Sequence, residues 1–241
     1  FGFLAIWLQW IQSTIWYPTV LTFGAVSIAF IGTNTTADAA LASNKIFTLA
    51  VVLAIYWCAT IISMRGIGWV GKVSKWGGII GTIIPAALLI VLGIVYLASG
   101  GHNYMDMHRS FFPDLTHFDN LVLASSIFLF YAGMEMMGIH VMEVDNPARN
   151  YPKAIIIGSL MTVSLFILGT FSLGLIIPAN EINLTQSLLI GFDRYLQYLH
   201  LSWASPVIAV ALMFGVLAGV LTWVAGPSRG IFAVGKAGYL P

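Results

Sequence analysis

One acidic residue of this chain lies deep within an apolar stretch. Lys and Arg number 10 and Asp and Glu number 9, and among them only Glu135 is far from a polar segment. An acid at the centre of a membrane helix costs about 2.5–3.5 kcal/mol on insertion scales, so it usually faces a cavity or a partner. Glu135 is therefore a candidate gating or proton-coupling acid. A structural hydrogen bond to a neighbouring helix is the alternative interpretation.

Two glycines flank this acid. Gly133 and Gly138 would each weaken a helix interior by about 1 kcal/mol relative to alanine. Transporters bind their substrates where a membrane helix is broken, and the pattern around Glu135 is compatible with such a break. Because small residues also let helices approach closely, tight helix packing is the other interpretation.

A second polar group lies near the start of the chain. Gln9, Ser13, Trp16 and Tyr17 have the spacing i, i+4, i+7 and i+8, which places them on one face of a helix. A polar and aromatic face inside lipid could line a substrate path. It could equally bind a neighbouring helix through hydrogen bonds.

These residues belong to apolar stretches that are long enough to cross a bilayer. Hydrophobic residues make up 59% of the 241 residues and charged residues 8%, whereas a soluble domain has about 25% charged residues. A membrane helix needs about 20 mostly apolar residues, and continuous apolar runs favour helices over strands. We therefore predict one all-α, polytopic transmembrane domain over residues 1–241, with six spans at about 1–31, 46–64, 76–98, 120–142, 154–179 and 201–228.

The basic residues give the orientation of these spans. Seven of the ten fall on one side: Arg65, Lys72, Lys75, Arg149, Lys153, Arg229 and Lys236. Loops rich in Lys and Arg stay in the cytoplasm, so this side is predicted to be cytoplasmic and the protein to lie in the cell inner membrane.

Helix packing can be predicted in the third span. Gly77 and Gly81 have the GxxxG spacing, which favours close packing against another helix. Pro85 follows them, and a proline inside a helix usually kinks it.

Several function classes are not supported. The single cysteine, Cys58, cannot form an intrachain disulfide, and no Cys/His cluster with metal-ligand spacing occurs. No glycine-rich nucleotide loop, HExxH motif or Ser/His/Asp set is present, so we expect neither an enzyme nor a cofactor. The net charge of +1 gives no reason to expect a nucleic-acid partner.

Two long motifs carry a family resemblance. Residues 143–154 read EVDNPARNYPKA and residues 226–241 read GPSRGIFAVGKAGYLP. They resemble the segments after the sixth and eighth helices of the amino acid–polyamine–organocation (APC) transporters. Within that family the glutamate:γ-aminobutyrate antiporters are the most similar group, on the runs WLQWIQSTIWYPTVLTFG, YWCATIISM, GGHNYMDMH and FLFYAGMEMMGIHVM.

The resemblance implies a fold and a site. The chain would be a central fragment, helices three to eight, of a LeuT-like protein with two five-helix inverted repeats. Its sixth helix would be broken near residues 131–133, and Glu135 would act in inner gating. Leu129 stands where arginine:agmatine exchangers have a gating tryptophan, which argues against arginine exchange. The implied substrate-binding residues are Gln9, Ser13, Trp16, Phe130, Tyr131, Ala132, Gly133, Thr222 and Trp223.

The resemblance also implies an activity, namely proton-consuming, acid-activated exchange of external glutamate for internal γ-aminobutyrate, as used in acid resistance. No Lys or Arg lies inside the predicted spans. Burying an unpaired carboxylate is costly, so we expect glutamate to cross with its side chain protonated. Another amino-acid or amine permease of the same fold is one alternative, and a channel-like membrane protein is another.

Overall fold

The chain folds into a bundle of helices. The computed structural model describes residues 2–32, 34–105, 116–131, 133, 138, 141 and 144–238, and every regular element in these ranges is helical, which confirms the all-α prediction. The elements are α1 (Gly2–Ala29), α2 (Thr35–Ala42), α3 (Lys45–Met64), α4 (Ile67–Gly78), the π-helical turn η1 (Ile79–Ile83), α5 (Ile84–Ala98), α6 (Phe118–Tyr131), α7 (Pro147–Ile176), the 3-10 turn η3 (Ala179–Glu181), α8 (Ser187–Tyr198), the 3-10 turn η4 (Ser202–Ala204) and α9 (Ser205–Lys236).

Four described helical segments are long and apolar enough to cross a membrane. They are Lys45–Met64, Ile67–Ala98, Pro147–Ile176 and Ser202–Lys236. The 28 residues of α1 give it the length, but its polar residues lower its hydropathy below that of the other four. Of the most apolar 18-residue stretch of α7, only 6% is buried against other helices. An apolar helix with so little protein around it is suited to contact with lipid.

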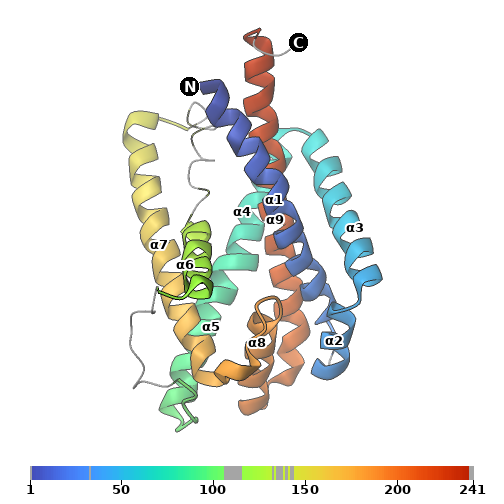
Figure 1. Cartoon of the computed structure of the whole chain (residues 1–241), viewed down its shortest axis with the longest axis vertical. Coiled ribbons are helices and arrows are strands. Elements are labelled where there is room, and N and C mark those ends of the chain that lie inside the picture. Colours follow the sequence, from blue (N-terminus) through green and yellow to red (C-terminus); the bar gives the residue numbers. More distant parts are fainter. Residues whose placement is uncertain are drawn as a thin grey trace.

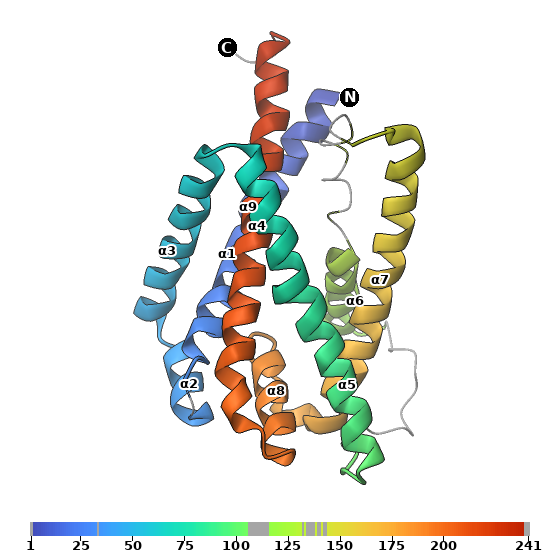
Figure 2. The same ribbon diagram turned by 180° about the vertical axis from the view of Figure 1, so that it is seen from behind.

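Two antiparallel helices form the centre of the bundle. Helices α1 and α9 cross side by side, with α3 and α4 packed around them and α7 on the other flank (Figure 1). The view from behind shows α4 continuing into α5 across α9 (Figure 2). This arrangement brings residues from the two ends of the chain together.

Glycines explain how closely α4 and η1 approach α9. A Cβ atom at Gly77 would lie 2.3 Å from the Ala218 Cβ, and one at Gly81 would lie 2.2 Å from the Gly215 backbone nitrogen. Only a residue without a side chain fits at such a contact. The packing role predicted for the glycine pair is therefore confirmed.

The irregular turn η1 lies directly before Pro85. The proline ring excludes the carbonyl four residues earlier, at Gly81, from an ordinary helical position. A wider π-helical turn accommodates this conflict, so the disturbance expected at Pro85 appears in Ile79–Ile83.

The two ends of the bundle differ in charge. The α3–α4 turn, the start of α7 and the end of α9 lie at one end, and α2 and α8 lie at the other (Figure 1). The first end carries the basic residues Arg65, Arg149 and Lys236. The positive-inside rule predicts that this end faces the cytoplasm, and we call it the inner end. Helix α1 therefore begins at the inner end, where α9 finishes.

The outer end is closed by the amphipathic helix α8. Its buried face, formed by Leu189, Phe192, Tyr195 and Leu196, packs into an apolar cluster that includes Leu92. Burial of such side chains contributes about 1.5–3 kcal/mol each. A second cluster, which includes Leu21, Ile55, Val220 and Leu221, holds α1, α3 and α9 together.

Candidate functional site

Two tryptophans join the central helices. The rings of Trp16 on α1 and Trp223 on α9 are stacked, with centroids 4.6 Å apart and planes inclined by 20°. Tyr17 meets Trp16 edge-on, with centroids 5.8 Å apart. Both tryptophans are half-buried. Two of the predicted site residues are thus brought into direct contact across the centre of the bundle.

A third predicted residue lies against this stack. Gly133 has φ +109°, a backbone conformation that side chains disfavour, and a Cβ added there would lie 3.3 Å from Trp223 Cζ2. Helix α6 ends at Tyr131, and Gly133 is not helical.

Other predicted residues fall beyond what the structure describes. Ala132 and Glu135 lie outside the described residues. The backbone of Phe130 and Tyr131 forms the last turn of α6, but their side chains also lie outside the description. The predicted roles of these four residues stay predictions.

Two hydroxyl residues of the predicted site are bonded within the protein. Ser13 is 2% exposed and its Oγ donates to the Gln9 carbonyl oxygen at 2.8 Å. The Thr222 hydroxyl forms hydrogen bonds of 3.0 Å with Ser74 Oγ and with the Ala218 carbonyl oxygen. Thr222 therefore links α9 to α4 in this conformation, and Ser13 is bonded within α1.

A cavity of about 1200 Å³ lies between the first half of α1 and the last turns of α9. We call it the inner cavity. Its polar lining residues are Gln9, Gln12 and Arg229, and the rest of the described lining is apolar or glycine, including Phe3 and Gly138. The predicted site residue Gln9 therefore lines this cavity.

Arg229 lies in a helix beyond the predicted end of the last span. The sequence predicts a last span at about residues 201–228. Helix α9 instead contains Pro227 and continues to Lys236, so Arg229 lies on the wall of the cavity. Its position in the motif GPSRG, directly after an apolar helix, was the available signal.

A polar network holds the outer end together. Asp193 of α8 accepts hydrogen bonds from Thr35 Oγ1 at 2.7 Å and from the Ser205 hydroxyl, which links α8 to both α2 and α9. Asp38 of α2 is 8% exposed. Its burial, together with the nearby Asp193 carboxylate, raises the pKa of the Asp38 carboxyl, although a backbone hydrogen bond from Asn34 opposes this.

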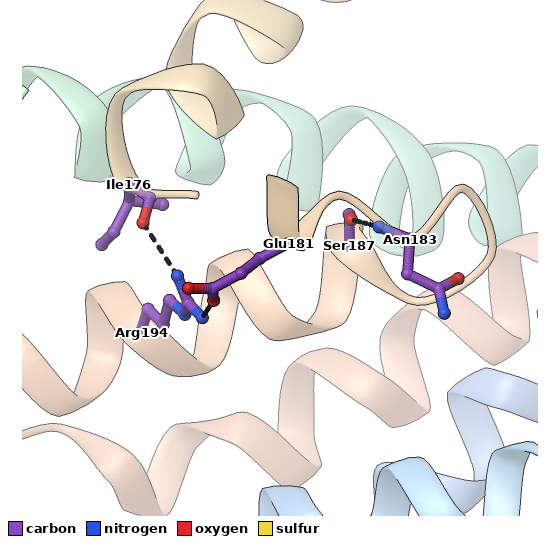
Figure 3. A network of polar contacts seen from close by, with 5 residues as sticks. All are labelled: Ile176, Glu181, Asn183, Ser187 and Arg194. Carbon is purple, nitrogen blue, oxygen red and sulfur yellow. Dashed lines mark hydrogen bonds and ion pairs between the residues drawn. The ribbon is translucent and has the colours of Figure 1, made fainter. Parts of the chain in front are cut away.

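The segment before α8 is also fixed by polar contacts. Figure 3 shows the Arg194 guanidinium between the Glu181 carboxylate, with which it forms an ion pair, and the Ile176 carbonyl oxygen at 3.2 Å. Nearby, the Asn183 backbone N–H donates to Ser187 Oγ at 2.8 Å. These contacts attach α8 to the end of α7.

Comparison with known proteins decides the family. The model of the family described as amino acid permease matches residues 1–241. The chain belongs to the amino acid permease family. This permease chain is 34% identical over 248 residues to a glutamate/gamma-aminobutyrate antiporter of Lactococcus lactis subsp. cremoris (strain MG1363), which covers 100% of the chain and 48% of the relative.

Two further relatives are transporters. An uncharacterised transporter of Legionella pneumophila is 32% identical over 240 residues, or 100% of the chain and 51% of the relative. A probable agmatine/putrescine antiporter of Lactococcus lactis is 23% identical over 229 residues, or 93% and 46%. The permease chain spans about half the length of these relatives. With its apolar helices, this family membership makes it part of a multi-pass inner-membrane protein of a transporter family, not of an enzyme family.

Proposed function

We propose that the permease containing this chain exchanges external glutamate for internal γ-aminobutyrate. The observation that carries the proposal is the contact between Trp16 and Trp223, with Gly133 next to the Trp223 ring. Full-chain similarity to glutamate/gamma-aminobutyrate antiporters supports the choice of substrates. The stacked rings of Trp16 and Trp223 would block the transport path, and the end of α6 would bind the substrate.

The substrate's charged ends need partners at this point. Helix α6 ends at Tyr131, and the carbonyl groups at the end of a helix carry a partial negative charge. They would attract the ammonium group that glutamate and γ-aminobutyrate share. Trp16 and Trp223 would cover the aliphatic part of either substrate and exclude water.

The side-chain carboxylate needs a different solution. Neither α1 nor the part of α9 before Arg229 contains a Lys or Arg. An ionised carboxylate at the tryptophan stack would be costly to bury. We propose that glutamate passes with this group protonated, that γ-aminobutyrate leaves as a cation, and that Glu135 couples the proton to the inner gate. Acid outside would then drive the exchange.

Counterflow in proteoliposomes tests this function. Full-length protein would be loaded with γ-aminobutyrate and supplied with labelled glutamate outside. Uptake should require the internal substrate, since a channel would not need one, and it should rise steeply as the external pH falls. Equal rates at pH 5 and pH 8 would reject the protonated-glutamate mechanism. Competition by a panel of amino acids and amines distinguishes this exchanger from another permease of the same fold.

A further inference from the structure

Helix α4 has a buried face and an exposed face of different composition. Val70 and Gly77 are buried, and their face of the helix packs against α9. Trp69, Lys72 and Trp76 follow one another at spacings of three and four residues, so they share the opposite face. The two tryptophans are 53% and 55% exposed. Large aromatic side chains and a cation are therefore presented together on the outside of the bundle.

The described part of the chain does not cover this exposed face. Cβ atoms added at Gly66, Gly68 and Gly71 would find no described atom within 4 Å. In the view from behind, α4 crosses in front of α9 (Figure 2). The face is therefore open to the bilayer or to another molecule.

Three cations gather on the exposed face. Arg65 and Lys72 lie over the Trp69 ring, 6.0 and 5.8 Å from its centroid, and Lys75 lies 5.8 Å from the centroid of the Trp76 ring. We call these five residues the basic face. Within the described ranges no carboxylate pairs with the three cations. An aromatic ring attracts a cation but carries no net charge, so the basic face keeps three positive charges for a ligand.

The segment that follows α4 determines how deep the basic face lies. Residues 79–98, which form η1 and α5, contain no charged side chain. At 1.5 Å per residue these 20 residues are about 30 Å long, which is the thickness of the hydrocarbon core of a bilayer. Helix α4 therefore extends past the hydrocarbon at the inner end and into the headgroup layer. Tryptophan is enriched in this layer of the membrane.

We propose that the basic face binds an anionic phospholipid of the cytoplasmic leaflet. The negative headgroup would lie among Arg65, Lys72 and Lys75, and the rings of Trp69 and Trp76 would pack against the glycerol backbone below it. Each Lys or Arg near an anionic membrane surface strengthens binding. A lipid such as phosphatidylglycerol supplies the negative charge that the three cations lack in the described chain, whereas phosphatidylcholine is neutral overall. This proposal does not depend on which substrate the permease transports.

The lipid would act on α9 through α4. Ser74 Oγ donates to the Ala218 carbonyl oxygen at 3.3 Å and accepts from the Thr222 hydroxyl at 3.0 Å. Thr222 directly precedes Trp223 on α9. A lipid that holds α4 at a fixed depth would therefore stabilise the contact of α4 with α9 beside the tryptophan stack.

Native mass spectrometry of the full-length permease tests the site. The purified protein would be titrated with dioleoylphosphatidylglycerol, and the Kd of the first bound lipid would be measured. Lys72→Gln/Lys75→Gln should raise this Kd at least about tenfold, because two cations beside the headgroup are lost. Dioleoylphosphatidylcholine should bind the wild type and this variant equally. Arg149→Gln/Lys153→Gln removes two exposed charges near the start of α7 at the same end of the bundle, and it should leave the Kd for dioleoylphosphatidylglycerol unchanged.

A second variant covers loss of folding in Lys72→Gln/Lys75→Gln. Gly68→Glu places a carboxylate in open space one turn before Lys72, where it competes with the headgroup, and it should also raise the Kd at least about tenfold. Gly68→Ala occupies the same space without a charge and should not raise it. An unchanged Kd in either charge variant would overturn the site, and so would an equal rise in Arg149→Gln/Lys153→Gln.

A soluble competitor identifies the ligand as a lipid. A large excess of glycerol 1-phosphate carries the headgroup phosphate without acyl chains, so it should not displace the bound dioleoylphosphatidylglycerol. Displacement would show that the basic face binds soluble phosphates and would overturn the assignment to a phospholipid. None of these measurements requires transport, so their outcome is independent of the proposed exchange.

Discussion

Gly133 makes the tryptophan stack sensitive to a single methyl group. Its φ of +109° disfavours any side chain, and an added Cβ would lie 3.3 Å from Trp223 Cζ2. Gly133→Ala should therefore shift both the backbone and the ring, at a cost of about 1–2 kcal/mol for the left-handed conformation alone. We expect exchange in proteoliposomes to fall at least about tenfold.

A matched glycine separates strain from function. Gly66 also has a positive φ, of +97°, but nothing lies within 4 Å of its added Cβ. Gly66→Ala should carry a similar backbone cost and leave exchange unchanged. Equal loss of exchange in both variants would show that backbone strain, and not contact with Trp223, is responsible.

Thr222 has two interpretations that one measurement separates. The sequence resemblance places it among the substrate-binding residues, whereas in the structure its hydroxyl links α9 to Ser74 of α4. If the link is its main role, Thr222→Ala should lower the free energy of unfolding by about 1 kcal/mol, and the substrate KM should stay the same. A raised KM with unchanged stability would favour substrate binding.

At the scale of elements, the contact between η1 and α9 tests how closely two helix backbones must pack. A Cβ at Gly81 would lie 2.2 Å from the Gly215 nitrogen and 2.4 Å from the Ala211 carbonyl oxygen. Both atoms are backbone, so the helices themselves must separate. Gly81→Ala should cost about 1–3 kcal/mol, as overpacking does elsewhere, and lower the Tm. Gly78→Ala, with nothing within 4 Å, should raise the Tm or leave it unchanged.

The same elements show what a sequence can predict. The spacing of Gly77 and Gly81 predicts a close contact because small residues are favoured wherever helices meet in lipid. It cannot identify Gly215 and Ala218 as partners, because they lie far along the chain and the choice depends on the topology. Tertiary packing also decides where α9 ends, and that is why Arg229 was assigned to a loop.

The arrangement of the predicted site residues could be foreseen only in part, because it too depends on tertiary packing. The family resemblance implies that Trp16, Trp223 and Gly133 belong to one substrate site. The structure brings these three residues together, and their binding role stays a prediction. The direction of a hydroxyl depends on the local acceptors, so the bonds of Ser13 and Thr222 could not be predicted. The link from Asp193 to Thr35 depends on how α8 folds back over α2, which no local pattern specifies.

At the scale of the whole molecule, the outer end contains a titratable contact between elements. The pKa of Asp38 is raised by burial and then by the Asp193 carboxylate, which itself accepts from Thr35 and Ser205. The folded protein therefore holds the Asp38 proton more tightly than the unfolded chain does. The free energy of unfolding rises as the pH falls through this pKa, and the contribution is lost as the pH rises above it.

This linkage predicts that acid tightens the outer end. Amide hydrogen exchange of α2, corrected for intrinsic rates, should show more protection near pH 4, close to the ordinary carboxyl pKa, than at pH 8 in the wild type. In Asp38→Asn the repulsion is absent, so protection of α2 should be high at both pH values. Asp145→Asn, at an exposed acid near the start of α7, should behave like the wild type. If Asp38→Asn kept the full pH dependence, another group would control the contact of α2 with α8, and the carboxyl pair would have no part in it.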